Sequence, residues 1–177
     1  GKATMRLISI NVGAWLPVQS IVEDLILNAP YITLFFGLIP KTVIESFFVW
    51  QFFTYMFLHA LNPMHVLFNM LSLWFFGAEL ESRWGGRLFL IYYLVCGVGA
   101  GLFYVFVISV IGLNKGVEPS VYMEPVIGAS GAIFGVLLAY GVLFGEQIIY
   151  FFGVFPMKAK FFVLIIGVVE LVSLLSS

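Results

Sequence analysis

Apolar residues run along this chain in stretches of helical length, separated by short polar segments. A membrane helix needs about 20 mostly apolar residues, whereas a barrel strand alternates apolar and polar residues over about ten positions. The pattern therefore predicts an all-α membrane protein, a polytopic helix bundle, and argues against a barrel. We expect five helices in one domain covering residues 1–177, at Met5–Leu27, Met64–Leu80, Leu88–Ile111, Ser130–Phe144 and Phe161–Leu175.

Two segments between these helices are too polar or too broken to be spans. Residues 28–53 are rich in aromatic side chains but are interrupted by prolines and charges, which is typical of a structured loop lying at the membrane interface. Residues 114–126 contain Lys115, Glu118 and Glu124 and are expected to form a second loop. The first helix is the weakest of the five because Pro17, Gln19, Glu23 and Asp24 interrupt it.

Composition supports the membrane assignment. Of the 177 residues, 62% are hydrophobic and 10% are charged, whereas soluble domains carry about 25% charged residues. Such a chain cannot cover a water-facing surface. Its net charge of −1 gives no reason to expect a nucleic-acid partner. Cys96 is the only cysteine, so it cannot form an internal disulfide and is expected to serve packing.

The distribution of basic residues predicts the orientation in the membrane. Cytoplasmic loops of membrane proteins carry an excess of lysine and arginine. With a cytoplasmic N-terminus, the cytoplasmic side receives six basic residues and the opposite side two, Lys41 and Lys115. The six are Lys2, Arg6, Arg83, Arg87, Lys158 and Lys160. We therefore expect a multi-pass integral membrane protein with its N-terminus in the cytoplasm.

A serine lies between two glycines at the start of the fourth helix, in the sequence Gly128-Ala129-Ser130-Gly131. Small residues before a serine allow a sharp turn, and a helix beginning at the serine points free N–H groups at a bound group. A helix of 15 residues reaches roughly 22 Å, against about 30 Å for the hydrocarbon core. Ser130 is therefore expected at the floor of a pocket open to the outer side.

Helix packing is an alternative explanation of the same residues. Gly131, Gly135 and Ala139 recur at four-residue spacing, which is a common pattern where two membrane helices come close together. Judged by this stretch alone, packing is the better supported explanation. Gly97 and Gly101 follow the same spacing on the third helix, where they allow either close helix contact or a dimer face. The oligomeric state is therefore left open.

The second helix carries polar residues that need partners at membrane depth. His65 and Asn69 are four residues apart, so they share one helical face, and with the predicted orientation they lie at the depth of Ser130. They are either hydrogen-bonding residues between helices or donors to the oxygen of a tetrahedral intermediate, together with the Ser130 amide. His59 fits a loop cap or a site residue equally well. Two histidines without an acidic or thiol ligand nearby do not predict a metal site.

Three stretches resemble the rhomboid family of intramembrane serine proteases. They are WQFFTYMFLHALNPMHVLFNM (residues 50–70), GAELESRWG (residues 77–85) and GASGAIFG (residues 128–135). The resemblance implies a core of six helices, with the serine on the fourth and a histidine base on the sixth. Position by position, it makes Ser130 the nucleophile, His65 and Asn69 the oxyanion-hole residues with the Ser130 amide, and Gly128 and Gly131 the motif glycines.

The chain departs from the family pattern at two places. Gln51 lies where arginine is frequent, which weakens any inference about how the first loop is anchored. The family's A-H-x-x-G-type motif is absent, because His59 and His65 are the only histidines. We therefore expect the chain to hold five of the six core helices, with the general base beyond it. A serine hydroxyl needs such a base to act as a nucleophile.

The leading hypothesis is cleavage of transmembrane substrates within the bilayer, near the outer membrane face, without metal or organic cofactor. An inactive rhomboid-like protein that binds membrane helices is the alternative, and a small channel or transporter is a third possibility. By resemblance alone, a core of this size suggests a prokaryotic inner membrane.

Overall fold

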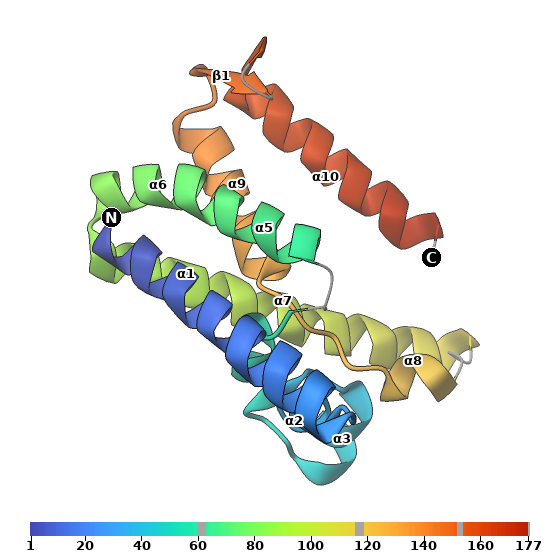
Figure 1. Cartoon of the computed structure of the whole chain (residues 1–177). Helices are drawn as coiled ribbons and strands as arrows, with labels where there is room; N and C mark the ends of the chain where they lie inside the picture. Colours follow the sequence, from blue (N-terminus) through green and yellow to red (C-terminus); the bar gives the residue numbers. More distant parts are fainter. Residues whose placement is uncertain (60–62, 116–118, 152–153, 177) are drawn as a thin grey trace.

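The computed structural model describes residues 1–59, 63–115, 119–151 and 154–176, and helices dominate it (Figure 1). Each predicted long helix corresponds to a helical segment of the structure. These segments are α1 (Lys2–Gly13) continued by η1 (Ala14–Leu27), α5 (Pro63–Ser72) continued by η3 (Leu73–Gly77) and α6 (Ala78–Trp84), α7 (Gly86–Lys115), α9 (Ser130–Leu143) and α10 (Ala159–Ser176). Helix α7 packs against α1, α6 and α9, and α10 packs against α9.

The predicted interfacial loop is built of short helices. They are α2 (Tyr31–Phe36), α3 (Pro40–Ser46), α4 (Gln51–Thr54) and η2 (Tyr55–Phe57). In Figure 1 this region lies at the end of the first helix, beside the middle of α7. The prediction of a structured segment rather than a span agrees with this arrangement.

By length and composition, two helices of the described chain can cross a membrane, Lys2–Leu27 and Gly86–Val110. Ser130–Leu143 and Ala159–Val168 are shorter apolar helices. This criterion therefore identifies two spans, where the sequence pattern predicted five. The shortness of the helix that begins at Ser130 was itself expected from the sequence.

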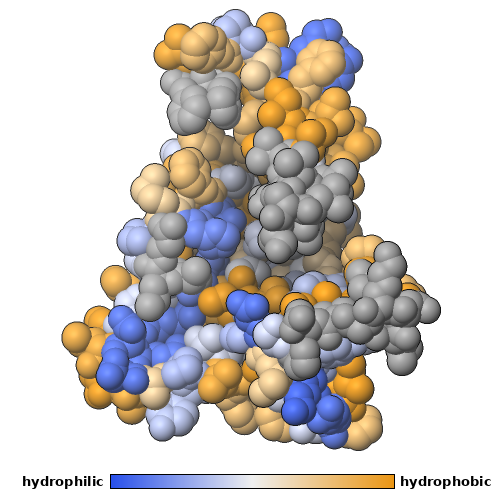
Figure 2. Space-filling view, turned by 90° about the vertical axis from the view of Figure 1, so that its right-hand side faces the viewer, coloured by the Kyte–Doolittle hydropathy of each residue, from blue (hydrophilic) through white to orange (hydrophobic). Residues whose placement is uncertain are grey.

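The surface is apolar over much of its area. Large exposed side chains occur along the helices, including Leu25, Trp74, Val95, Phe103 and Val142. Figure 2 shows the face on the right-hand side of Figure 1, where hydrophilic residues gather mainly in the lower half and hydrophobic residues are frequent in the upper half. Such a surface fits surroundings of lipid, since lipid tails do not penalise exposed apolar side chains.

One predicted boundary was wrong, and two elements were not predicted. Helix α7 extends to Lys115, and the expected loop after it contains a further helix, α8 (Pro119–Met123). A β-hairpin between α9 and α10 was not predicted, and its strands are β1 (Ile148–Phe151) and β2 (Phe155–Lys158). The hairpin is held at its open end by Glu146, which accepts hydrogen bonds from Lys158 and Lys160. Four-residue apolar strands give too short a pattern to distinguish from the ends of neighbouring helices.

The first helix remains continuous through its polar residues, two of which, Gln19 and Glu23, face inward. Pro17 lies in the π-helical segment η1, whose wider turns accommodate a residue that cannot donate to the helix ladder. Gln19 and Glu23 are four residues apart and both are buried. The Glu23 carboxylate accepts hydrogen bonds from the amide and the hydroxyl of Thr33, at 2.7 and 2.8 Å. Thus the residues that weaken the apolar pattern attach the first helix to the rest of the molecule.

Close helix packing uses the glycines that the sequence singled out. A Cβ atom on Gly131 would lie 2.7 Å from the Cβ of Ala100, and one on Gly135 would lie 2.5 Å from the Cys96 sulfur. On a neighbouring face of α7, Gly101 packs against Tyr55 and Leu38. The expectation of close packing is therefore confirmed at these glycines. A dimer face at Gly101 is excluded, because the chain's own loop covers that position.

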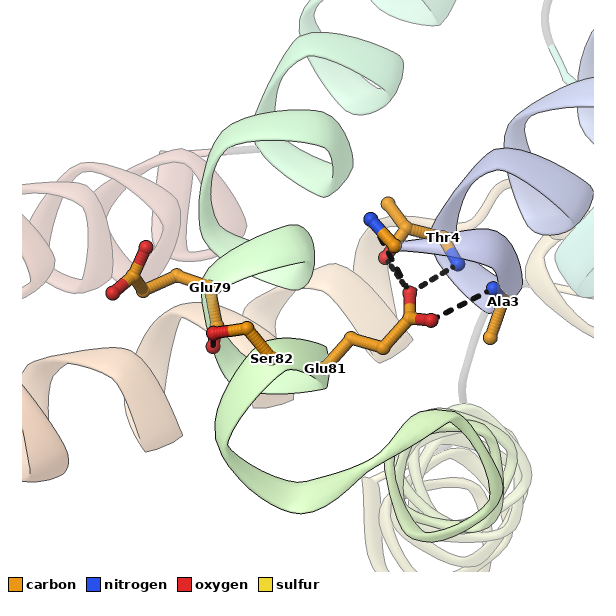
Figure 3. Close-up of polar contacts among 6 residues, drawn as sticks. Ala3, Thr4, Glu79, Glu81 and Ser82 are labelled. Atoms are coloured by element: carbon orange, nitrogen blue, oxygen red, sulfur yellow. Dashed lines mark hydrogen bonds and ion pairs between the residues drawn. The ribbon is translucent and has the colours of Figure 1, made fainter.

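A carboxylate on α6 joins the second helical segment to the first (Figure 3). The Glu81 side chain accepts hydrogen bonds from the amides of Ala3 and Thr4, at 2.9 and 2.8 Å, and from the Thr4 hydroxyl at 2.6 Å. Glu79 leaves the same helix in a different direction. This cluster fixes the start of α1 against the turn between α6 and α7.

Candidate active site

Ser130 is the first residue of α9, and the segment before it is held by backbone hydrogen bonds. Val126 pairs with Leu38 in an antiparallel bridge, with both N–H···O distances at 2.9 Å. The Gly128 amide then donates to the Tyr55 carbonyl at 3.0 Å. Gly128 has φ = +132°, a conformation that residues with a side chain rarely adopt. A glycine is therefore required two residues before the serine, as the sequence indicated.

The space on one side of Gly128 is surrounded by groups from two helices. A Cβ atom built on Gly128 would lie 3.5 Å from His65 Nε2, 3.6 Å from Ser130 Oγ and 3.8 Å from the Ser130 amide nitrogen. His65 Nε2 and Ser130 Oγ are thus no more than about 7 Å apart. A side chain at position 128 would fill the space between them. The absence of a side chain leaves room there for a substrate group.

The α5 helix supplies the imidazole and an amide to the same region. His65 is exposed, and Asn69 lies one turn further along α5, which packs against α9. Asn69 is 9% exposed, and its Nδ2 has no hydrogen-bond partner among the described residues. A buried amide donor without a partner is costly in a folded protein, so such groups are frequently found at functional sites. The structure therefore places His65 close to Ser130, with Asn69 one turn further along the same helix.

The arrangement has the elements needed to stabilise an oxyanion beside a hydroxyl. Ser130 is exposed, so its Oγ is accessible, and as the first residue of a helix it has an N–H that the helix does not use. The positive end of the α9 dipole also lies at this residue. Donors that are already oriented stabilise developing negative charge without reorganising. Gly131 contributes differently, because its lack of a side chain lets α9 approach Ala100 on α7.

His59 lies close to His65, and its backbone is held in place by Gln19 on the first helix. It is fully buried, with its ring centroid 6.2 Å from that of His65. Its backbone is held by Gln19, whose side chain accepts from the His59 amide at 2.8 Å and donates to the His59 carbonyl at 3.0 Å. Burial and the neighbouring His65 lower the pKa of His59 to about 4, so its ring is neutral at pH 7. Both ring nitrogens lack partners among the described residues.

Gln51 anchors the predicted interfacial loop. The sequence alone did not show how this loop is held. Its buried side chain accepts hydrogen bonds from the Ile39 amide at 3.1 Å and the Thr42 hydroxyl at 2.8 Å. It donates to the carbonyls of Leu34 and Phe35, at 3.3 and 3.2 Å. The neutral amide of Gln51 accepts two hydrogen bonds and donates two, and it thereby joins α2, α3 and α4. This arrangement buries no charge.

Replacing Gln51 by alanine is expected to destabilise the folded protein by about 2–4 kcal/mol, because the buried Ile39 amide and the partly buried Thr42 hydroxyl and Leu34 carbonyl lose hydrogen bonds at once. Thermal unfolding in detergent measures this change. Gln147→Ala is the matched control, since Gln147 is exposed and its side chain accepts one hydrogen bond, from the Tyr140 hydroxyl. The control should lose less than about 1 kcal/mol. Equal losses in the two variants would contradict the anchoring role of Gln51.

Sequence reasoning missed two residues that shape this region. Gln19 was treated only as an interruption of the first helix, and Tyr55 was not considered. The four-residue spacing of Gln19 and Glu23 within an apolar helix was the available signal, since polar residues in membrane helices normally face protein partners.

Within the described residues, no group of three or more histidine, cysteine, aspartate or glutamate side chains could hold a metal ion.

Comparison with protein families gives a match over most of the chain. The Rhomboid domain model matches residues 46–177, which include His59, His65, Asn69, Gly128 and Ser130.

Individual relatives match over shorter stretches. The chain is 37% identical over 95 residues to RHOMBOID-like protein 1 of Arabidopsis thaliana, which is 54% of this chain and 21% of that protein. It is 30% identical over 125 residues to Rhomboid-like protein 15 of the same plant, covering 70% of this chain and 31% of the relative. It is 33% identical over 92 residues to the rhomboid protease AarA of Providencia stuartii, which is 51% of this chain and 32% of that protein. The matched regions thus span between about a fifth and a third of these relatives.

Proposed function

This chain belongs to the rhomboid family, whose members are integral membrane proteins, and from that premise we propose that the complete protein is an intramembrane serine endopeptidase. The observation that carries the proposal is the grouping of His65 Nε2, Ser130 Oγ and the Ser130 amide around Gly128. The relative AarA, which is named a rhomboid protease, supports the same reaction class.

In the proposed reaction, Ser130 Oγ attacks the scissile carbonyl carbon while its proton passes to a general base. The carbonyl π electrons move to the oxygen, and His65, Asn69 and the Ser130 amide donate hydrogen bonds to the resulting oxyanion. When the tetrahedral intermediate collapses, the peptide C–N bond breaks and the leaving amine takes the proton from the base. Water then hydrolyses the acyl-enzyme by the same steps.

We assign the general base to a histidine outside these 177 residues. His65 is a poor candidate, because using it as the base would remove one donor from the oxyanion. His59 is fully buried, with its ring centroid 6.2 Å from that of His65, and we do not assign the base to it. The family pattern supplies a histidine on a sixth helix, so the chain would hold five of six core helices. No metal or organic cofactor has a part in this scheme.

The proposed topology follows the positive residues, with a cytoplasmic N-terminus and Ser130 nearer to the outer face. The relatives named above come from a plant and a bacterium, so they do not favour a prokaryotic inner membrane over another location. The substrates would be transmembrane proteins, and a substrate helix must unwind locally because only an extended segment presents its carbonyl to Ser130.

The direct test of this function is reconstitution of the complete protein with a model transmembrane substrate in liposomes. The proposal predicts cleavage, with the cut mapped by mass spectrometry to the part of the substrate helix near the outer face. Cleavage confined to soluble loops, or no cleavage by a folded complete protein, would overturn the proposal.

One observation favours the alternative of an inactive relative that binds membrane helices. Only His59 and His65 occur among these 177 residues, and we assign neither of them as the base for Ser130. This alternative predicts that the complete protein binds a transmembrane peptide without cutting it. It also predicts that the protein does not react with a probe for activated serines.

A further inference from the structure

A groove runs between α1 and α7, on the part of the molecule away from Ser130. The two helices pack side by side, and both begin near the turn that Glu81 fixes. The groove encloses about 610 Å³. Its lining includes three basic residues, Lys2 and Arg6 on α1 and Arg87 on α7.

The positive charges of this groove are available to a ligand. All three basic side chains are exposed, and none forms an ion pair within the part of the chain that the structure describes. The one acidic residue in the lining, Glu81, is already bonded to Ala3 and Thr4 and lies next to the N-terminal amine at 3.7 Å. The first turns of two helices add their positive dipole ends. The mouth of the groove therefore favours an anion.

The length of the groove is apolar. Lys2, Arg6 and Ile10 follow one another at four-residue spacing on α1 and so share one helical face. Two basic side chains at the start of this face are followed by an exposed apolar one. Leu90 follows Arg87 by three residues on α7 in the same sense. Leu7 is buried between the helices. A ligand that fits has a charged head at the start of both helices and an apolar tail beyond it.

We propose that this groove binds an anionic phospholipid. Its phosphate contacts Lys2, Arg6 and Arg87, and one acyl chain lies along Ile10 and Leu90. Basic pockets between membrane helices are known to select anionic headgroups. The three residues belong to the more basic side of the chain, which the charge pattern assigns to the cytoplasm. A free phosphate would use the charges but not the apolar walls, so the combination favours a lipid.

The test is native mass spectrometry of the complete protein in neutral detergent, where no charged membrane surface is present. Wild type is expected to retain phosphatidylglycerol about tenfold better than phosphatidylcholine, which carries no net charge. Replacing two contacting cations, Arg6→Gln with Arg87→Gln, is expected to weaken phosphatidylglycerol retention by about tenfold or more. Ile10→Trp should also reduce retention, because it fills the groove without changing the charge.

The matched control is Lys158→Gln with Lys160→Gln, which removes two positive charges away from the groove. It is expected to keep wild-type retention of phosphatidylglycerol. Excess glycerol phosphate should fail to displace the lipid. The proposal is overturned if both double variants lose lipid equally, if folded groove variants retain it fully, or if glycerol phosphate displaces it.

Discussion

Replacing Ser130 by alanine in the complete protein is expected to reduce cleavage of a reconstituted transmembrane substrate by roughly 10⁴-fold or more, to the background of the assay. The physical reason is that the Ser130 hydroxyl lies with His65 Nε2 and the amide at the start of α9 around Gly128. The oxyanion donors would remain in place, but they accelerate nothing without a nucleophile that forms the acyl-enzyme. The initial rate of product formation in liposomes measures the loss.

Ser109→Ala is the matched control for this substitution. It removes a serine hydroxyl from α7. There the Ser109 hydroxyl donates to the Val105 carbonyl of its own helix at 2.7 Å. We expect the rate of this variant to stay within about twofold of wild type, because surface or local changes of this kind rarely exceed ±0.5 kcal/mol. Comparable cleavage by the folded Ser130 variant and by wild type would refute the assignment of the nucleophile.

The second large effect is expected at Asn69. Removal of one oxyanion-hole donor typically lowers kcat by roughly 10²–10³-fold. Asn69→Ala should do so while KM changes little, because the Nδ2 group has no partner among the described residues and would be used only when negative charge develops. Steady-state kinetics with one reconstituted substrate separate kcat from KM.

A substitution of the same type elsewhere separates catalysis from stability. Asn11 is also buried, and its Nδ2 donates to the Leu7 carbonyl at 2.8 Å within α1. Asn11→Ala is therefore expected to lower thermal stability while kcat stays within about threefold of wild type. If Asn69→Ala lost no more activity than Asn11→Ala, the oxyanion role of Asn69 would be wrong.

The sequence predicted the helices and the grouping of polar residues because both depend on short-range rules. Apolar runs of helical length give the long segments, and a spacing of four places His65 and Asn69 on one face. Loop charges and the shortness of the fourth helix then indicated that Ser130 lies at the same depth. The contact around Gly128 agrees with that expectation, while the catalytic roles of these residues stay predictions.

What the sequence did not reveal depends on contacts between distant segments. Gln19 interrupts an apolar helix in the sequence, yet it binds the backbone of His59 forty residues away. Gln51 departs from the family pattern, yet its amide makes four hydrogen bonds that anchor the loop. Neither partner can be read from local spacing. Inward-facing polar residues indicate that a partner exists, but only the fold identifies it.

The central claim is that Ser130 is an activated nucleophile in the complete protein. Treatment of that protein with a fluorophosphonate probe, followed by peptide mass spectrometry, tests this claim most directly, because the probe reacts with activated serines and needs no substrate. Our account predicts one covalent adduct, on Ser130, and no labelling of the Ser130→Ala variant. A folded complete protein that stays unlabelled, or that carries the adduct on another residue, would contradict it.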